Sequence, residues 1–222
     1  KISGRITCSI PAAPAPALTR NVTASRTSPG SREWGRECLP KLNGMWAFVI
    51  YDRRHRRLFG SRDRFGVKPL YYSRDHTVIQ FASEIKALRA SGYQRVGINW
   101  RIASRFLLEG RLDSHNETFY DGIEQIPPGS GFEVGLDGAW HQWTFWTLDA
   151  LPKTIAPDPA ATFGDLFEDS VRIRMRSDVP VGVCLSGGLD STAIICAAAR
   201  HRDESAGTQP ESLQAFCYMA KE

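Results

Sequence analysis

The chain has 222 residues, of which 42% are hydrophobic and 23% charged, and its formal net charge is +4. This composition is ordinary for a folded globular protein and excludes a wholly disordered chain, a collagen-like chain and a coiled-coil rod. No apolar run reaches the roughly 18 residues of a membrane-spanning helix, so no membrane partner is expected. A charge balance this mild also argues against a nucleic-acid partner. The length allows one large domain or two small ones.

Five cysteines without a C-x-x-C pair form neither a zinc-site pattern nor a disulfide pattern. Cys184, Cys196 and Cys217 lie in apolar segments, where we expect them to act as small hydrophobic side chains. This usage fits a reducing compartment, and the sequence does not begin with an apolar leader stretch, so a cytoplasmic location is expected.

Residues 1–32 are rich in Ala, Pro, Ser, Thr and Arg and show no hydrophobic period. Such a segment buries too little apolar surface to offset its chain entropy, so it is predicted to be disordered. Its composition also resembles that of a peptide translated from GC-rich DNA in the wrong reading frame. We therefore expect a non-homologous or frame-shifted extension, which the other reading frames of the gene would reveal.

From residue 33 onward, short segments rich in aromatic and β-branched residues alternate with turn signals, which favours antiparallel hairpins. The expected strands are Met45–Tyr51, Leu58–Arg62, Leu70–Ser73, Val78–Ala82, Gly131–Val134 and Trp140–Phe145. Glu84–Ala90 and Trp100–Leu108 have helical spacing, with Asn99 as the N-cap of the second helix. The basic run Arg53–Arg57 lies between two expected strands and indicates a solvated hairpin loop.

Residues 151–158 contain prolines and are predicted to be a linker. A helix is expected over Pro159–Arg176, with an apolar side that includes Phe163, Leu166, Phe167 and Val171. Then follow a buried strand, a helix and a last strand, at Val181–Leu185, about Ser191–Arg200 and Leu213–Met219. This alternation predicts a parallel, Rossmann-like sheet, so the fold class is α/β, with a β-rich part first.

A glycine-rich turn, Ser186–Ser191, joins the expected strand to the expected helix. Gly187 and Gly188 let the backbone approach a ligand closely, and the N-terminus of a helix attracts anions, phosphate above all. Asp190 would repel a phosphate unless a cation bridged the two, which suggests Mg²⁺. The alternative is an ordinary strand–turn–helix corner capped by serine and aspartate. The pattern is neither a Walker A loop nor a nucleophile elbow.

The turn is similar to the SGGxDS pyrophosphate loop of enzymes that cleave ATP to AMP and pyrophosphate. Four other segments resemble glutamine-hydrolysing asparagine synthetases, namely Leu42–Phe48, Arg62–Tyr72, Phe81–Leu88 and Arg176–Gly182. The resemblance implies that residues 33–150 are the C-terminal part of a type 2 (class II) glutamine amidotransferase domain of the Ntn-hydrolase type. Such a domain is a sandwich of two sheets between helices. Residues 159–222 would then be the N-terminal part of the synthetase, or ATP-pyrophosphatase, domain.

The family forms asparagine by activating aspartate with Mg-ATP and supplying ammonia from glutamine, with glutamate, AMP and pyrophosphate as the other products. ATP, Mg²⁺, aspartate and glutamine are thus the implied small molecules, and the resemblance also allows a homodimer. The implied metal ligand is Asp190. The residues that the resemblance places at ATP are Leu185, Ser186, Gly187, Gly188, Asp190, Ser191 and Tyr218.

The sequence departs from the family at both ends. The nucleophilic N-terminal cysteine is missing, Cys8 and Cys38 stand in no comparable context, and Asn43-Gly44 indicates a turn rather than the oxyanion motif. We therefore assign no catalytic residue and expect a truncated enzyme without glutaminase or synthetase activity and with weak or no Mg-ATP binding. Two alternatives stay open: an amide ligase without glutaminase, such as a β-lactam synthetase or lasso-peptide cyclase, and a non-catalytic remnant.

Overall fold

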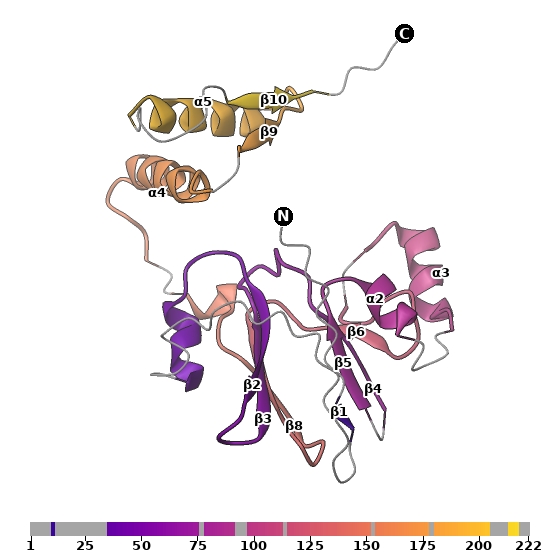
Figure 1. The fold of residues 1–222 in the computed structure, drawn as a ribbon. Helices are drawn as coiled ribbons and strands as arrows, with labels where there is room; N and C mark the ends of the chain where they lie inside the picture. Colours follow the sequence, from indigo (N-terminus) through magenta and orange to yellow (C-terminus); the bar gives the residue numbers. More distant parts are fainter. Residues whose placement is uncertain are drawn as a thin grey trace. The chain divides into compact units, whose positions relative to one another are not determined.

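The structure of the protein is a computed structural model that describes residues 10–11, 35–75, 78–91, 97–112, 115–151, 154–177, 180–204 and 213–217. The chain divides into two compact units, Lys1–Leu151 and Pro152–Glu222. The first unit is built on two antiparallel sheets, and the second combines a parallel pair of strands with two helices (Figure 1). The fold class is therefore α/β, as the sequence predicts.

Two four-stranded antiparallel sheets form the first unit. The first sheet has the order β2 (Ala47–Asp52), β3 (Arg57–Arg62), β7 (Ser130–Gly135) and β8 (Trp140–Thr144). The second sheet has the order β1 (Ile10–Pro11), β5 (Val78–Ala82), β4 (Tyr71–Arg74) and β6 (Ile123–Gln125). All six expected strands are present within about two residues of their predicted bounds.

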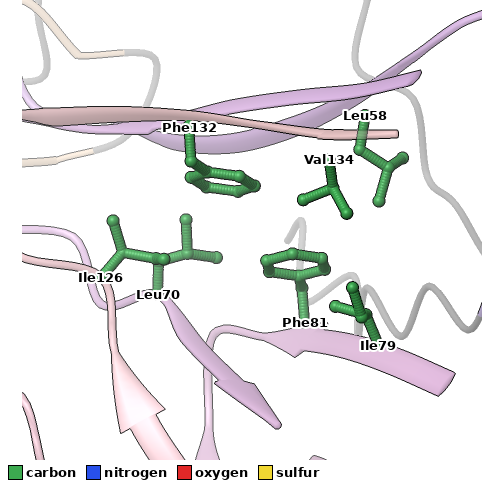
Figure 2. Close-up of a cluster of buried hydrophobic side chains, with 7 residues drawn as sticks. All are labelled: Leu58, Leu70, Ile79, Phe81, Ile126, Phe132 and Val134. Carbon is green, nitrogen blue, oxygen red and sulfur yellow. The ribbon is translucent and has the colours of Figure 1, made fainter. Parts of the chain in front are cut away.

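The main hydrophobic core lies between the two sheets (Figure 2). Phe81 of β5 and Phe132 of β7 stack face to face, with ring centroids 5.0 Å apart and an interplanar angle of 9°. The buried cluster consists of Leu58, Leu70, Ile79, Phe81, Ile126, Phe132 and Val134. Because these side chains come from both sheets, their burial holds the sheets face to face.

Short helices cover the outer faces of the sheets. The 3-10 helix η1 (Gly35–Lys41) packs Leu39 onto the first sheet, and α2 (Ile85–Ala90) packs Leu88 onto the second. The result is the sandwich of two sheets between helices that the family resemblance implies (Figure 1).

Helix α3 (Trp100–Glu109) begins where the sequence predicts it. The Asn99 side chain accepts a hydrogen bond from the backbone N–H of Ile102 at 3.3 Å, which confirms Asn99 as the N-cap. Gly110 ends the helix in the left-handed conformation, with a φ of +66°.

The basic run Arg53–Arg57 lies at the connection between β2 and β3, with Arg57 as the first residue of β3. Its four turn residues, 53–56, are exposed, which confirms the predicted solvated hairpin loop. The Asp52 carboxylate accepts hydrogen bonds from the backbone N–H groups of Arg54 at 3.0 Å and His55 at 3.2 Å. The hydrogen bond from the His55 side chain, together with these backbone bonds, lowers the pKa of Asp52 although burial acts the other way.

The prediction of disorder over residues 1–32 is wrong at Ile10–Pro11, which forms β1 and pairs with β5, Ile10 opposite Ile79. A sheet edge presents unpaired backbone groups that can accept a partner whatever side chains the partner carries, so hydrophobic periodicity is a poor guide here. The other residues of this segment lie outside the described residues, and the prediction stays a prediction for them.

The second unit has the predicted helix–strand–helix–strand order. Its elements are α4 (Pro159–Arg174), β9 (Gly182–Cys184), α5 (Leu189–Glu204) and β10 (Gln214–Phe216). β9 and β10 are parallel, as expected for a Rossmann-like arrangement. Val171 of α4 packs with Ala197 and Ala198 of α5 in a small core, and Glu168 of α4 accepts a hydrogen bond from Arg200 of α5.

Burial in the second unit is lower than the sequence predicts. Cys184, Cys196 and Cys217 are exposed, and neither β9 nor β10 carries a buried residue. Phe163 and Leu166, on the predicted apolar side of α4, are 69% and 66% exposed. Among the described residues, two short strands and two helices enclose a single small core, so apolar positions on their other faces have nothing to pack against.

A carboxylate on β7 is held between two arginines. Glu133 is only 8% exposed, accepts a hydrogen bond from Arg36 Nε at 3.1 Å, and lies 2.9 Å from Arg57 Nη1. The Arg36 hydrogen bond lowers the pKa of Glu133 below its usual value, and the charge of Arg57 adds to this, whereas burial acts the other way.

We expect Glu133 to make the first unit acid-sensitive. Its pKa is lower in the folded chain than in the unfolded chain. Its contribution to stability is therefore present above the unfolded pKa and is lost as the pH falls through the folded pKa. Urea midpoints measured from neutral pH to about pH 3 should fall more steeply for the parent chain than for Glu133→Gln. Glu37→Gln, which removes an exposed carboxylate of η1, is the control; parallel curves for the parent and Glu133→Gln would refute the prediction.

The close approach of Phe132 to β3 gives a second prediction. Gly60 pairs with Phe132 in the β3–β7 register, and a Cβ at Gly60 would lie 2.2 Å from Cζ of the ring. Gly60→Ala should therefore lower the free energy of unfolding by about 1–3 kcal/mol through overpacking, measured by chemical denaturation. Gly164→Ala in α4, where a Cβ meets nothing within 4 Å, should be neutral or stabilising. Equal stability of Gly60→Ala and the parent would show that the ring does not pack here.

Candidate functional site

The glycine-rich loop joins β9 to α5. Leu185, the residue before the loop, donates its backbone N–H to the carbonyl oxygen of Phe216 in β10 at 2.8 Å, so the loop starts from a fixed point. Gly187 has a φ of +81°, a backbone conformation that residues with a Cβ rarely adopt, so glycine is favoured there. The loop then enters the first turn of α5 at Leu189.

Hydrogen bonds between the two serines close the loop. The Ser186 and Ser191 hydroxyl oxygens lie 3.1 Å apart, and the backbone N–H of Ser186 donates to Ser191 Oγ at 3.3 Å. The backbone N–H of Gly188 donates to Ser186 Oγ at 3.4 Å. The loop residues thus supply hydrogen-bond partners to one another, and the side chains of the two serines lie together.

One residue of this network was not singled out from the sequence. The Thr192 hydroxyl donates to the carbonyl oxygen of Gly188 at 2.8 Å. A hydroxyl side chain four residues after a loop glycine at a helix start would have been the signal, because serine and threonine bond the carbonyl of residue i−4 in helices.

The loop has the features of an anion-binding site. The first N–H groups of a helix have no intrahelical partner, and the helix dipole adds partial positive charge at this end. The hydroxyls of Ser186 and Ser191 add further donors beside the first turn of α5. The arrangement can therefore receive a phosphate group.

The donor set also fits Mg²⁺ shared with a phosphate. Within the described parts of the chain, no group of three or more His, Cys, Asp or Glu side chains could hold a metal ion by itself. Mg²⁺ commonly binds through only one or two carboxylates, together with phosphate oxygens and water. Asp190 is an exposed carboxylate in the first turn of α5, and it precedes Ser191 in the sequence.

The structure therefore brings most of the predicted ATP-binding residues into one turn, namely Leu185, Ser186, Gly187, Gly188, Asp190 and Ser191. β10 pairs with β9. It belongs to the segment that resembles the family's strand beside the adenine of ATP. Tyr218, predicted to contact adenine, lies outside the described residues, so its role stays a prediction.

The described part of the first unit contains one cysteine, Cys38. Cys38 is 3% exposed, and burial raises the pKa of its thiol, which disfavours the reactive thiolate. Gly44 lies in a bend with a φ of +136°, consistent with the turn predicted at Asn43-Gly44. Cys8 lies outside the described residues.

None of the described helices is long and apolar enough to cross a bilayer.

Comparison with known proteins gives two family matches in succession. A family model described as a glutamine amidotransferase domain matches residues 30–146, more than half of the chain. A second model, described as asparagine synthase, matches residues 162–220 and so includes the loop.

Several curated relatives are named as glutamine-hydrolysing asparagine synthetases. The chain is 35% identical over 170 residues to asparagine synthetase [glutamine-hydrolyzing] 3 of Bacillus subtilis and 35% identical over 173 residues to asparagine synthetase [glutamine-hydrolyzing] 1 of the same organism. It is 32% identical over 168 residues to amidase chry2 of Gibberella zeae. These alignments cover 76%, 75% and 73% of this chain but only 28%, 26% and 24% of the relatives. The chain thus spans about a quarter of their length, and it belongs to the glutamine-hydrolysing asparagine synthetase family.

Proposed function

We propose that this chain serves asparagine biosynthesis, in which aspartate is amidated with ammonia taken from glutamine at the expense of ATP. The observation that carries the proposal is the SGGxDS loop at the junction of β9 and α5, within the asparagine synthase match. The products would be asparagine, glutamate, AMP and pyrophosphate. The glutamine-hydrolysing relatives support the ammonia source.

The chemistry explains why such a reaction needs this loop. A carboxylate is a poor acyl donor, so its oxygen first attacks the α-phosphorus of ATP and pyrophosphate leaves. Ammonia then attacks the acyl carbon, and AMP leaves. In this chain the N-terminus of α5 and the hydroxyls of Ser186 and Ser191 would bind the pyrophosphate portion, and Asp190 would hold Mg²⁺. Mg²⁺ would neutralise the charge that develops on the leaving pyrophosphate.

The proposal also assigns the parts of the chain to two domains and a linker. Residues 33–150 would belong to the type 2 glutamine amidotransferase domain, residues 151–158 to a linker, and residues 159–222 to the synthetase domain. The two family matches, to residues 30–146 and 162–220, support these bounds. No residue of the described chain is assigned to glutamine hydrolysis.

We place this chemistry in the cytoplasm and allow a homodimer. The free thiols of Cys38, Cys184 and Cys196 are consistent with a reducing compartment. ATP, aspartate and glutamine are the proposed small-molecule partners, and neither a nucleic acid nor a membrane is part of the proposal.

Mg-ATP binding at the loop is the direct test. In an NMR titration of the ¹⁵N-labelled chain, the amide signals of Gly187, Gly188 and Ser191 should shift with Mg-ATP or pyrophosphate and less with AMP. The affinity should be weak because the described sheet around the loop has only two strands. Asp190→Asn should weaken binding about tenfold or more, through loss of a charged ligand.

Asp165→Asn, which removes an exposed carboxylate from α4, is the matched control and should bind like the parent chain. The proposal fails if the loop amides do not respond to Mg-ATP at millimolar concentration, or if Asp165→Asn and Asp190→Asn have the same effect.

A further inference from the structure

The carbonyl oxygen of Gly188 accepts three hydrogen bonds at the start of α5. Two come from Thr192, from its hydroxyl at 2.8 Å and its backbone N–H at 3.2 Å. The third comes from the Ser191 hydroxyl at 3.2 Å. Because a carbonyl oxygen has two lone pairs, three donors share two acceptor positions, and the longer bond from the Ser191 hydroxyl is the easier side-chain bond to give up.

The Ser191 hydroxyl has only one proton to donate. While that proton is directed at Gly188, it cannot be donated to an anion in the loop. The oxygen of the same hydroxyl accepts a hydrogen bond from the Ser186 N–H at 3.3 Å, so the side chain keeps its place when its proton turns elsewhere. The Ser191 O–H group can therefore turn its hydrogen bond from the carbonyl to a ligand while the serine oxygen stays in place.

Resting on the proposed function, we infer that Thr192 is a positioning residue of this loop. Its hydroxyl satisfies the Gly188 carbonyl, so that the Ser191 hydroxyl is available to the pyrophosphate portion of ATP. Thr192 itself does not touch the ligand. Without its hydroxyl, Gly188 would keep the Ser191 proton, and a phosphate oxygen would have to compete for it. The asparagine synthase match over residues 162–220 supports a nucleotide at this loop independently of these hydrogen bonds.

Helix α4 contains the same local geometry without a glycine-rich loop. The Thr162 hydroxyl donates to the carbonyl of Asp158, four residues earlier, at 2.8 Å, and the Thr162 N–H donates to the same oxygen at 3.1 Å. Replacing Thr162 by valine removes the same kind of hydrogen bond from a helix start, so this variant is a matched control for Thr192→Val.

The test is a Mg-ATP titration of the whole chain, followed through the loop amide signals. Thr192→Val should weaken binding about three- to tenfold, the change expected from one neutral hydrogen bond, while Thr192→Ser should stay within about twofold of the parent. Thr162→Val should bind like the parent. Because valine and threonine are both β-branched, the backbone preference at Thr192 is unchanged in the first variant.

A double-mutant cycle separates positioning from simple support of the helix. In a Ser191→Ala background there is no Ser191 proton to release, so Thr192→Val should cause no further loss, whereas a purely structural role would cost the same in both backgrounds. Far-UV circular dichroism checks folding, and Thr192→Ala replaces Thr192→Val if the latter does not fold.

Three results would overturn the inference. Parent-like binding by Thr192→Val, with Asp190→Asn still impaired, would refute the role of Thr192 and leave the proposed function intact. Equal losses in both backgrounds of the cycle would show a structural role only. A parent chain whose loop does not respond to Mg-ATP would instead refute the proposed function, and the inference with it.

Discussion

Two charged side chains at the end of β3 hold together the loops that join the sheets of the first unit. Arg62 is 7% exposed and Asp63 is 1% exposed. The Arg62 guanidinium donates to the carbonyl oxygens of Gly66, Lys68 and Ile126 at 2.7–2.9 Å. The Asp63 carboxylate accepts hydrogen bonds from three backbone N–H groups of the loop that follows. Because a buried charge without partners costs several kcal/mol, these loops are held to a conformation that supplies the partners.

The position of the apolar core follows from this polar network. Ile126, whose carbonyl binds Arg62, donates its own N–H to the carbonyl of Leu70 at 2.8 Å, and both side chains are buried between the sheets. The loops before β4 and after β6 therefore enter the core at a fixed place. In the other sheet, Gly60 of β3 leaves room for the ring of Phe132, its partner on β7, so a larger residue at Gly60 would displace this ring from the core.

The sequence predicts those features that depend on local pattern. Strands with alternating apolar residues, the Asn99 cap and the strand–loop–helix junction are all local, and they are found where predicted. The Arg62 network is not local, since its partner Ile126 is 64 residues away, and charged residues are ordinarily predicted to be exposed. Burial of β9 was overestimated because apolar composition shows what a strand can bury, not whether another element lies against it. Thr192 was missed because its signal, a hydroxyl near a helix start, is not specific: Thr162 of α4 makes the same bond to the carbonyl four residues earlier without a glycine-rich loop.

The two units use polar groups in opposite ways, and this difference explains why the loop is the better candidate for binding. Around Arg62 and Asp63 the partners are backbone groups of a closed sandwich, and exchange for a ligand would leave buried groups unsatisfied. In the loop, Ser186 and Ser191 are paired with each other at 3.1 Å, and the loop is largely exposed. Water can replace any bond that is broken there, so the cost of exchanging an internal hydrogen bond for one to a phosphate oxygen is small. A charge-assisted bond to phosphate is stronger than the hydroxyl–hydroxyl bond it replaces, so the balance favours the ligand.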